Sequence, residues 1–161
     1  MVVIIMGVVG AGKTTVGRLL SSQLGYEFQD ADDFHAKASV EKIRHGIALS
    51  DEDREPWLDR LREAIVGWIA SGNNVVLACS ALKRAYRTKL RAGPQVQFVY
   101  LKGSATLIAE RLLARHGHFA GESILQSQLA DLEEPEKAIT LEISNTPERI
   151  VAEIRKELHL G

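Results

Sequence analysis

Residues 7–14, Gly7-Val8-Val9-Gly10-Ala11-Gly12-Lys13-Thr14, decide the fold of this 161-residue chain. They match the pattern G-x4-G-K-[ST] and stand between an apolar run at 2–6 and a segment with helical spacing. The glycines let backbone N–H groups turn inward around phosphate oxygens, at the positive end of the helix that follows. The pattern predicts a strand, a phosphate-binding loop and a helix, hence a nucleotide-binding protein. A glycine-rich turn that only caps a helix would not need the complete motif.

Each position of the motif has an expected role toward ATP and Mg²⁺. Lys13 is expected to reach the β- and γ-phosphates, and the Thr14 hydroxyl to ligate magnesium. Thr15 adds a hydroxyl near the α-phosphate. Four further positions are expected to complete the ATP site: Gly7, Gly10, Ala11 and Gly12. Switches, motors and kinases share this motif, so it does not define the reaction.

Several apolar runs are continuous rather than alternating, which is typical of strands buried on both faces of a parallel sheet. They span residues 2–6, 74–79, 96–101 and 139–143, with a weaker strand expected at 26–29. Segments with helical spacing separate them, the clearest being 51–71, which Ser50 can cap. Alternating strands and helices with right-handed crossovers predict a three-layer α/β fold, a five-stranded parallel sheet flanked by helices.

The composition excludes several classes of function. The 20 Lys and Arg residues nearly balance 21 Asp and Glu residues, and the net charge of -1 gives no general attraction to nucleic acid or to a membrane. Cys79 is the single cysteine, and no apolar run reaches the roughly 18 to 20 residues of a membrane-spanning helix. We expect a single cytoplasmic domain over residues 1–161, without nucleic-acid or membrane partners.

Carboxylates after the second strand favour a kinase over the other classes with this loop. A GTPase would carry D-x-x-G and Asn-Lys-x-Asp segments, and the sequence has neither. A motor ATPase would usually end a buried strand on an acidic residue, whereas the run that ends at Cys79 continues into Ser80. Asp30, Asp32 and Asp33 follow the second strand instead. This placement resembles small-molecule kinases of the shikimate and nucleoside-monophosphate type.

The resemblance becomes narrower along the rest of the chain. Several segments resemble, in order, motifs of the gluconate kinases, which are related to the shikimate kinases: residues 28–35, 41–58, 79–83 with 86–87, 115–119, and 127–128 with 132–133 and 135. The patterns D-x-D-R-x-P-W-L and C-S-A-L-K are specific to that family. The resemblance extends from residue 4 to about residue 147 and implies a P-loop kinase fold with a mobile lid.

This resemblance implies phosphorylation of D-gluconate at its 6-hydroxyl, with ATP as the phosphate donor and Mg²⁺ as the metal. It is also compatible with a homodimer. It implies an acceptor-binding segment at about 30–58 and a lid at about 115–132. Ala31, Ala36 and Ser39 depart from the glycine, proline and asparagine that are usual there. A kinase for another sugar acid, polyol or shikimate-like acceptor therefore stays open. A regulator that binds nucleotide without catalysis is the alternative from another class.

Phosphoryl transfer needs positioning and charge neutralisation, so carboxylates are candidate site residues. Asp32 is expected to hold and polarise the attacking hydroxyl, and Asp30 to orient Mg²⁺ through bound water. Two carboxylates two residues apart at a strand end point the same way. The alternative for residues 30–33 is a solvated turn, which Asp33 fits best.

An acceptor with a carboxylate calls for cations of defined geometry. The candidates for acceptor contacts are Arg54, Lys83, Arg87 and also Lys42, with His35 for a hydrogen bond to a hydroxyl and His118 where the lid closes on the acceptor. Each cation could instead be a surface charge in an ion pair worth about 0 to 1 kcal/mol. His35 could equally be a packing or capping residue.

Arg111 and Arg115 lie four apart in a helical stretch and so share a face. By the resemblance, both belong to the catalytic machinery of the lid and reach the phosphates, with Arg111 also binding ATP. The alternative is an exposed helix with solvated arginines. Trp57, Trp68 and Cys79 are expected in the core, and adenine is expected near residues 145–147.

Overall fold

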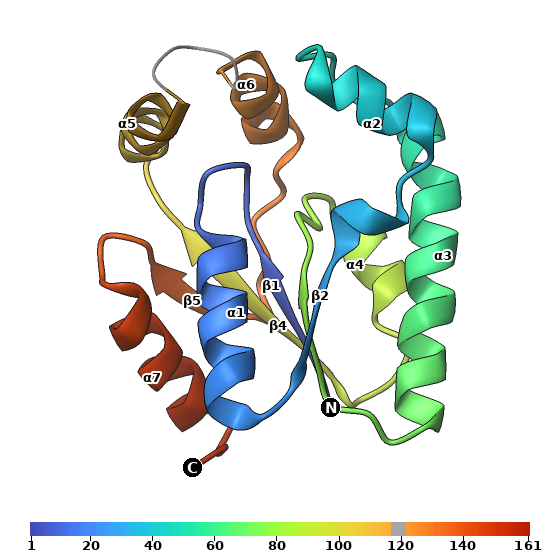
Figure 1. The fold of residues 1–161 in the computed structure, drawn as a ribbon, viewed down its shortest axis with the longest axis vertical. Helices are drawn as coiled ribbons and strands as arrows, with labels where there is room; N and C mark the ends of the chain where they lie inside the picture. The colour runs from blue at the N-terminus through green and yellow to red at the C-terminus, as the bar shows by residue number, and fades with distance from the viewer. Residues whose placement is uncertain (117–121) are drawn as a thin grey trace.

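The computed structural model describes residues 1–116 and 122–161 as a parallel sheet between two layers of helices (Figure 1). Its strands are β1 (Val2–Met6), β2 (Glu27–Asp30), β3 (Val75–Ala78), β4 (Val96–Lys102) and β5 (Ile139–Glu142). They lie in the order β2-β3-β1-β4-β5, and every neighbouring pair is parallel. The predicted sheet is confirmed, with strand ends shifted by one residue in most cases.

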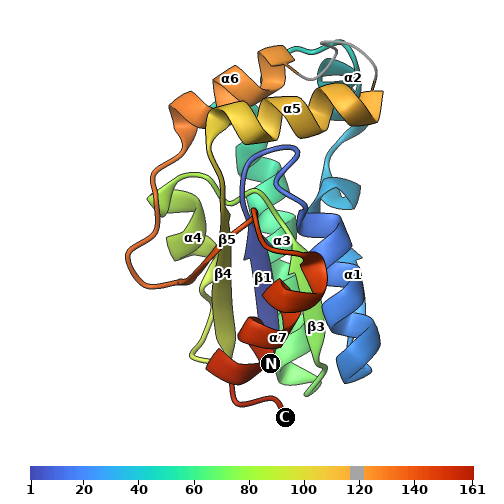
Figure 2. The ribbon, with the colours of Figure 1, turned by 90° about the vertical axis from the view of Figure 1, so that its left-hand side faces the viewer.

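Helices cover both faces of this sheet and one of its ends. They are α1 (Lys13–Leu24), α2 (Lys37–Arg44), α3 (Asp51–Ala70), α4 (Arg84–Leu90), α5 (Ala105–His116), α6 (Glu122–Asp131) and α7 (Pro147–Glu157), with a 3-10 turn, η1 (Ala31–Phe34). Figures 1 and 2 show α5 and α6 above the carboxyl ends of the strands, with α2 nearby. Within the described ranges, no helix is both long and apolar enough to cross a bilayer.

Strand β1 separates two hydrophobic cores. Val3 and Ile5 pack with the residues of α1 and α7, whereas Val2, Ile4 and Met6 pack with those of α3 and α4. Successive side chains of a strand point to opposite faces, so a strand covered on both faces must be apolar throughout. This is the physical reason for the continuous apolar runs in the sequence.

Helix α3 begins where the sequence predicts. The Asp53 N–H donates to Ser50 Oγ at 3.1 Å, and the Ser50 N–H donates to Asp53 Oδ2 at 3.0 Å, which completes a capping box. Lys42 Nζ lies 3.0 Å from the same Asp53 oxygen and ties α2 to this end of α3. Trp57 is buried as expected, and Trp68 is half-buried with its ring edge against Phe34.

Replacing Ser50 with Ala should lower the free energy of unfolding by about 1 kcal/mol, because the Asp53 N–H loses its side-chain acceptor. Urea denaturation measures the change. Ser22→Ala is the matched control, since Ser22 is exposed on α1 and its loss should change the free energy by less than about 0.5 kcal/mol. Equal effects of the two substitutions would contradict the capping role.

Candidate active site

A cavity of about 270 Å³ opens at the carboxyl end of the sheet, where ligands bind in open α/β folds. Its lining comes from the loop at 7–14, from the turn after β2, from α3, and from the helices above. The sequence-predicted residues that it brings together are Gly10, Gly12, Lys13, Thr14, Thr15, Asp30, Asp32, His35, Arg54 and Arg115. Their roles stay predictions at this point, but their convergence on one hollow is a property of the fold.

The loop at 7–14 surrounds the ammonium group of Lys13. Lys13 Nζ donates to the carbonyls of Gly7 and Val8, each at 3.0 Å. Burial lowers the pKa of Lys13, and the carboxylates of Asp32 and Asp30 oppose that shift. Gly10 adopts φ +82°, and a Cβ there would lie 2.8 Å from Leu112 Cγ, so glycine is needed both for the turn and for the contact with α5.

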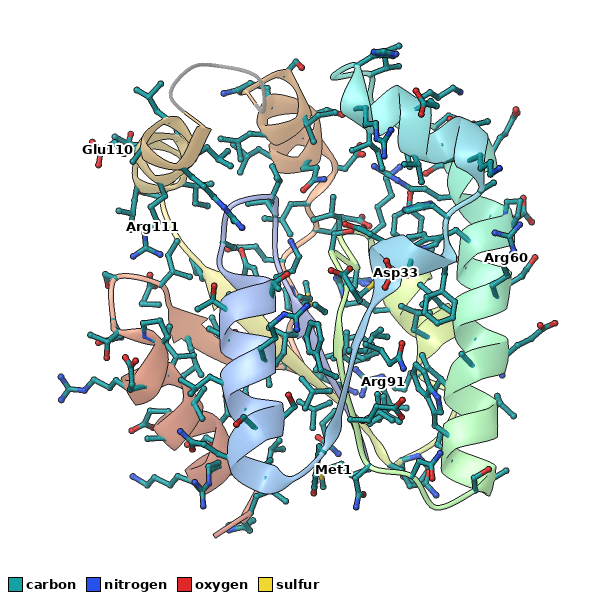
Figure 3. All side chains as sticks on the ribbon, in the orientation of Figure 1. Met1, Asp33, Arg60, Arg91, Glu110 and Arg111 are labelled. Atoms are coloured by element: carbon teal, nitrogen blue, oxygen red, sulfur yellow. The ribbon has the colours of Figure 1, made fainter. Side chains whose placement is uncertain are left out.

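Asp30 and Asp32 converge by a route that differs from the expected one. Strand β2 ends at Asp30, whose Oδ1 accepts the Asp32 N–H at 2.9 Å and so caps the 3-10 turn. It is this turn, rather than strand alternation, that brings the Asp32 carboxylate to the cavity. Asp33, labelled beside η1 in Figure 3, does not line the cavity, and its side chain is exposed, which fits the solvated turn.

The protein around these carboxylates changes their acidity. The Asp32 side chain is open to the cavity, yet desolvation raises its pKa, and the Lys13 ammonium opposes that shift. Desolvation likewise raises the pKa of Asp30, and the hydrogen bond from the Asp32 backbone opposes it. Asp32 and Lys13 thus stabilise each other's charged form in a recess that favours neither charge alone.

His35 lies flat against Trp57 on one side of the cavity. The two rings are 4.4 Å apart between centroids and 13° from parallel, and Trp57 Nε1 donates to Ala31 O at 2.7 Å. Burial lowers the pKa of His35 to about 4, with Arg54 and Arg60 adding to the shift. The imidazole is therefore neutral at pH 7. Its Nδ1 is buried without a hydrogen-bond partner among the described residues.

Arg54 is buried, and it is the only one of the predicted acceptor cations that lines the cavity among the described residues. Its Nη1 donates to Tyr86 Oη and to Asp131 Oδ2, both at 3.0 Å. The other predicted cations lie elsewhere. Lys83 Nζ pairs with Asp51 at 2.9 Å, and Lys42 pairs with Asp53.

Arg87 is buried but does not point into the cavity. Its Nη1 donates to the carbonyls of Ala81 and Leu82 at 2.7 and 3.0 Å, and its Nη2 donates to Glu133 O at 2.7 Å. These bonds join α4 to the segment that follows α6. Arg87 therefore does not line the cavity with Arg54, because its guanidinium donates to three backbone carbonyls, and its contact with the acceptor stays a prediction.

Arg111 and Arg115 share a face of α5, as their spacing predicts. Arg111 Nη2 donates to Ile143 O at 2.5 Å and projects from α5 towards the end of β5, whereas Glu110 projects outward (Figure 3). Arg111 lines a second hollow of about 240 Å³ together with Asn145 and Pro147, where adenine is expected. Arg115 lines both hollows. Ala11 lines the second hollow, and His118 lies outside the described residues.

Helix α6 contributes contacts that the sequence did not predict. The Val9 N–H donates to Gln128 Oε1 at 2.7 Å, and Ser123 Oγ donates to Gly46 O at 3.0 Å. Gln128 lies in one of the segments that resemble a family motif, which was a signal for its importance. Nothing in the sequence pattern indicated the partners of Arg54, because Tyr86 and Asp131 are 32 and 77 residues away.

The positions at which the sequence departs from the gluconate-kinase pattern do not line the cavity. Ala31 is buried in the core beneath the 3-10 turn, and Ser39 is buried on α2. Ala36 precedes α2 as its N-cap. Ala31 and Ser39 therefore affect packing beneath η1 and α2, and Ala36 is exposed, so none of the three forms part of the cavity surface.

The donor set beside Lys13 fits Mg²⁺. Thr14 and Asp30 offer a hydroxyl and a carboxylate to the same cavity, and Mg²⁺ prefers oxygen ligands. Over residues 1–116 and 122–161 there is no group of three or more His, Cys, Asp or Glu that could hold a metal ion. In nucleotide sites Mg²⁺ takes one or two protein ligands and completes its shell with phosphates and water.

Comparison with known proteins gives consistent matches over almost the whole chain. The family model of shikimate kinase matches residues 9–158. A probable gluconokinase of Xenopus tropicalis is 42% identical, covering 98% of this chain and 93% of the relative. Two solved structures are similar in sequence and fold. A sugar kinase of Janibacter sp. has 42% identity and a TM-score of 0.90, covering 98% of this chain and 94% of its own. A gluconokinase of Sinorhizobium meliloti has 37% identity and a TM-score of 0.84, covering 98% of this chain and 95% of its own.

The neutral state of His35 predicts a pH dependence of stability. Between its ordinary pKa of 6.5 and about 4, the unfolded chain takes up a proton that folded His35 does not, so stability falls as the pH decreases through this window. Urea denaturation at pH 7 and pH 5 should show a smaller loss for His35→Asn than for the wild type. His159→Asn, at an exposed position, is the control. An equal loss of unfolding free energy in wild type and His35→Asn would contradict the lowered pKa of His35.

Proposed function

The chain belongs to the gluconokinases within the shikimate kinase family, and we propose that it transfers the γ-phosphate of ATP to the 6-hydroxyl of D-gluconate, giving 6-phospho-D-gluconate and ADP. One observation carries the proposal: Lys13 and Thr14 of the phosphate loop share a single cavity with Asp32 and Arg54. The proposal is supported as well by gluconokinases that match over nearly their full length.

The nucleotide lies with its phosphates along the loop at 7–14, where backbone N–H groups and the start of α1 favour negative charge. The Lys13 ammonium neutralises charge on the β- and γ-phosphates. Thr14 and Asp30 hold Mg²⁺, which supplies further charge neutralisation when it is bound. Arg115 faces the phosphates from α5, and Arg111 faces the nucleotide from the neighbouring hollow.

Asp32 acts on the acceptor. Its carboxylate accepts a hydrogen bond from the 6-hydroxyl, orients that oxygen towards the γ-phosphate and takes up its proton as the new bond forms. The raised pKa makes Asp32 a better proton acceptor, and the charge of Lys13 keeps it ionised at neutral pH. No covalent intermediate is needed, so positioning and charge account for the chemistry.

The acceptor's own carboxylate binds the guanidinium of Arg54, and the neutral imidazole of His35 forms a hydrogen bond with one of its hydroxyls. Helices α5 and α6 form the lid that excludes water during transfer. Lys83 and Lys42 do not line this cavity, and their ammonium groups pair with Asp51 and Asp53, so their contact with the acceptor stays a prediction. A homodimer and a cytoplasmic location stay predictions.

Release of ADP, measured with a coupled assay, tests the acceptor. Gluconate should give turnover well above that of shikimate and nucleoside monophosphates, because these lack either the primary hydroxyl for Asp32 or the carboxylate for Arg54. Other sugar acids carry both groups, so gluconate should exceed them through the fit of its remaining hydroxyls. Turnover of another acceptor without turnover of gluconate would overturn the proposal. A chain that binds ATP but phosphorylates none of them would be a nucleotide-binding regulator.

Asp32→Asn should lower kcat with gluconate by about 10²–10⁴-fold, since an amide cannot take up the hydroxyl proton. Binding of ATP, measured by calorimetry, should change little. Asp33→Asn is a matched control, because it removes the same charge one position along the chain from a residue that does not line the cavity. If both variants kept wild-type turnover, Asp32 would have no role in proton transfer.

A further inference from the structure

We propose that Asp131 and Tyr86 are positioning residues that hold Arg54 in the orientation required to bind the acceptor's carboxylate. Helix α6, through Asp131, would then take part in the selection of an anionic acceptor. This inference rests on the proposed function, because it concerns how the same site recognises charge.

Two elements from distant parts of the chain fix the guanidinium of Arg54. Tyr86 Oη on α4 and Asp131 Oδ2 at the end of α6 each accept from Nη1 at 3.0 Å. The Arg54 side chain is only 9% exposed, and its guanidinium carbon lies 5.6 Å from the centre of the Tyr86 ring. An arginine held by two acceptors on one nitrogen and packed against a ring has one orientation rather than many.

In the part of the chain that the structure describes, the opposite edge of the guanidinium has no hydrogen-bond acceptor and can take a ligand. Among the residues that the structure describes, Nη1 is the nitrogen of Arg54 that has hydrogen-bond acceptors, and Arg54 lines the cavity. Carboxylates bind arginine through two parallel N–H···O bonds on one edge of the fork. With Nη1 occupied by the protein, the edge formed by Nε and Nη2 is the one suited to the acceptor.

The charges around Arg54 are balanced along a chain of contacts. Lys83 pairs with Asp51, the Tyr86 hydroxyl donates to Asp51, and Arg54 donates to the Tyr86 oxygen and to Asp131. Asp131 is thus the counter-ion of a buried cation. Without it, an arginine charge would be buried with only a neutral partner, which is costly.

The ion pair with Arg54 also stabilises Asp131 at an unfavourable position in its helix. Asp131 is the last residue of α6, where the helix dipole is negative and disfavours a carboxylate. The Arg54 guanidinium offsets that unfavourable placement. Two groups that would each be unfavourable alone, a buried arginine and an acid at a helix carboxyl end, therefore stabilise each other.

The remaining contacts of α6 connect this pair to the nucleotide loop and to the acceptor segment. Gln128 accepts from the Val9 N–H in the loop, and Ser123 donates to Gly46 between α2 and α3. The place of α6 over the cavity sets where the oxygens of Asp131 lie, and these set the orientation of Arg54. Recognition of the acceptor's charge therefore depends on how α6 is seated.

Asp131→Asn tests the proposal when kcat/KM is compared for gluconate and for gluconamide, an uncharged analogue that keeps the hydroxyls. For gluconate, kcat/KM should fall by about tenfold or more, mostly through KM, because the carboxylate meets a displaced guanidinium. For gluconamide it should change by less than about twofold, since no charge contact is lost. Where gluconamide turnover is too slow to measure, its dissociation constant serves instead.

A double-mutant cycle separates positioning from general structural damage. In an Arg54→Ala background, Asp131→Asn should cause no further loss with gluconate, because Asp131 acts through Arg54. Asp131→Glu should restore part of the discrimination. Glu136→Gln is the control, since Glu136 is an exposed acid whose nearest cation, Arg84, is 4.0 Å away.

Thermal unfolding checks that the variants fold. If Asp131→Asn does not fold, Tyr86→Phe carries the same comparison, because it removes the other acceptor of Nη1 and keeps the ring. Equal losses for gluconate and gluconamide, or no change for either, would overturn the inference. A wild-type protein that does not phosphorylate gluconate would instead overturn the proposed function, so the two failures are distinguishable.

Discussion

The site depends on the opposed charges of Lys13 and Asp32 in a recess where neither charge would be favourable alone. The parallel sheet produces this meeting, because the segments that leave the carboxyl ends of β1 and β2 emerge at the same edge. β3 lies between these two strands in the sheet and ends in Ala78, followed by buried Cys79, on the wall of the same cavity. One edge of the sheet thus carries both the phosphate loop and the carboxylate that faces it.

The part of the cavity near β1 and the part near α3 differ in the charges of the side chains that line them. Near β1, the loop and Lys13 favour phosphate. Near α3, His35 stays neutral beside Arg54, and this cation is balanced by Asp131 from α6. Among the described residues, Arg54 is the cation that lines the cavity beside the neutral imidazole, and this pair suits the proposed acceptor, which has many hydroxyls and one negative charge. The electrostatics of the acceptor side agree with a sugar acid.

Much of the fold and part of the candidate site could be predicted from the sequence. Strands buried on both faces leave continuous apolar runs, and the P-loop motif is contiguous, so the sheet and Lys13 were accessible to local reasoning. The Ser50 cap was predictable because a capping interaction spans three residues. The convergence of Asp30 and Asp32 was also predicted, but through strand alternation, whereas a 3-10 turn capped by Asp30 produces it.

Tertiary partners could not be predicted in this way. Lys83 and Arg87 have the right charge and lie in family-like segments, yet one pairs with Asp51 and the other donates to three carbonyls. The carbonyls that Arg87 reaches belong to Ala81, Leu82 and Glu133, which come together only when the segment after α6 packs beside α4. The pair of Arg54 and Asp131 likewise depends on how two helices meet, and no local pattern encodes it.

A crystal structure with a non-hydrolysable ATP analogue, Mg²⁺ and gluconate tests the central claim most directly. The account predicts the analogue's terminal phosphate beside Lys13 and the gluconate 6-hydroxyl within hydrogen-bonding distance of the Asp32 carboxylate. Gluconate bound with its 6-hydroxyl away from Asp32, or with Asp32 turned out of the cavity, would contradict it.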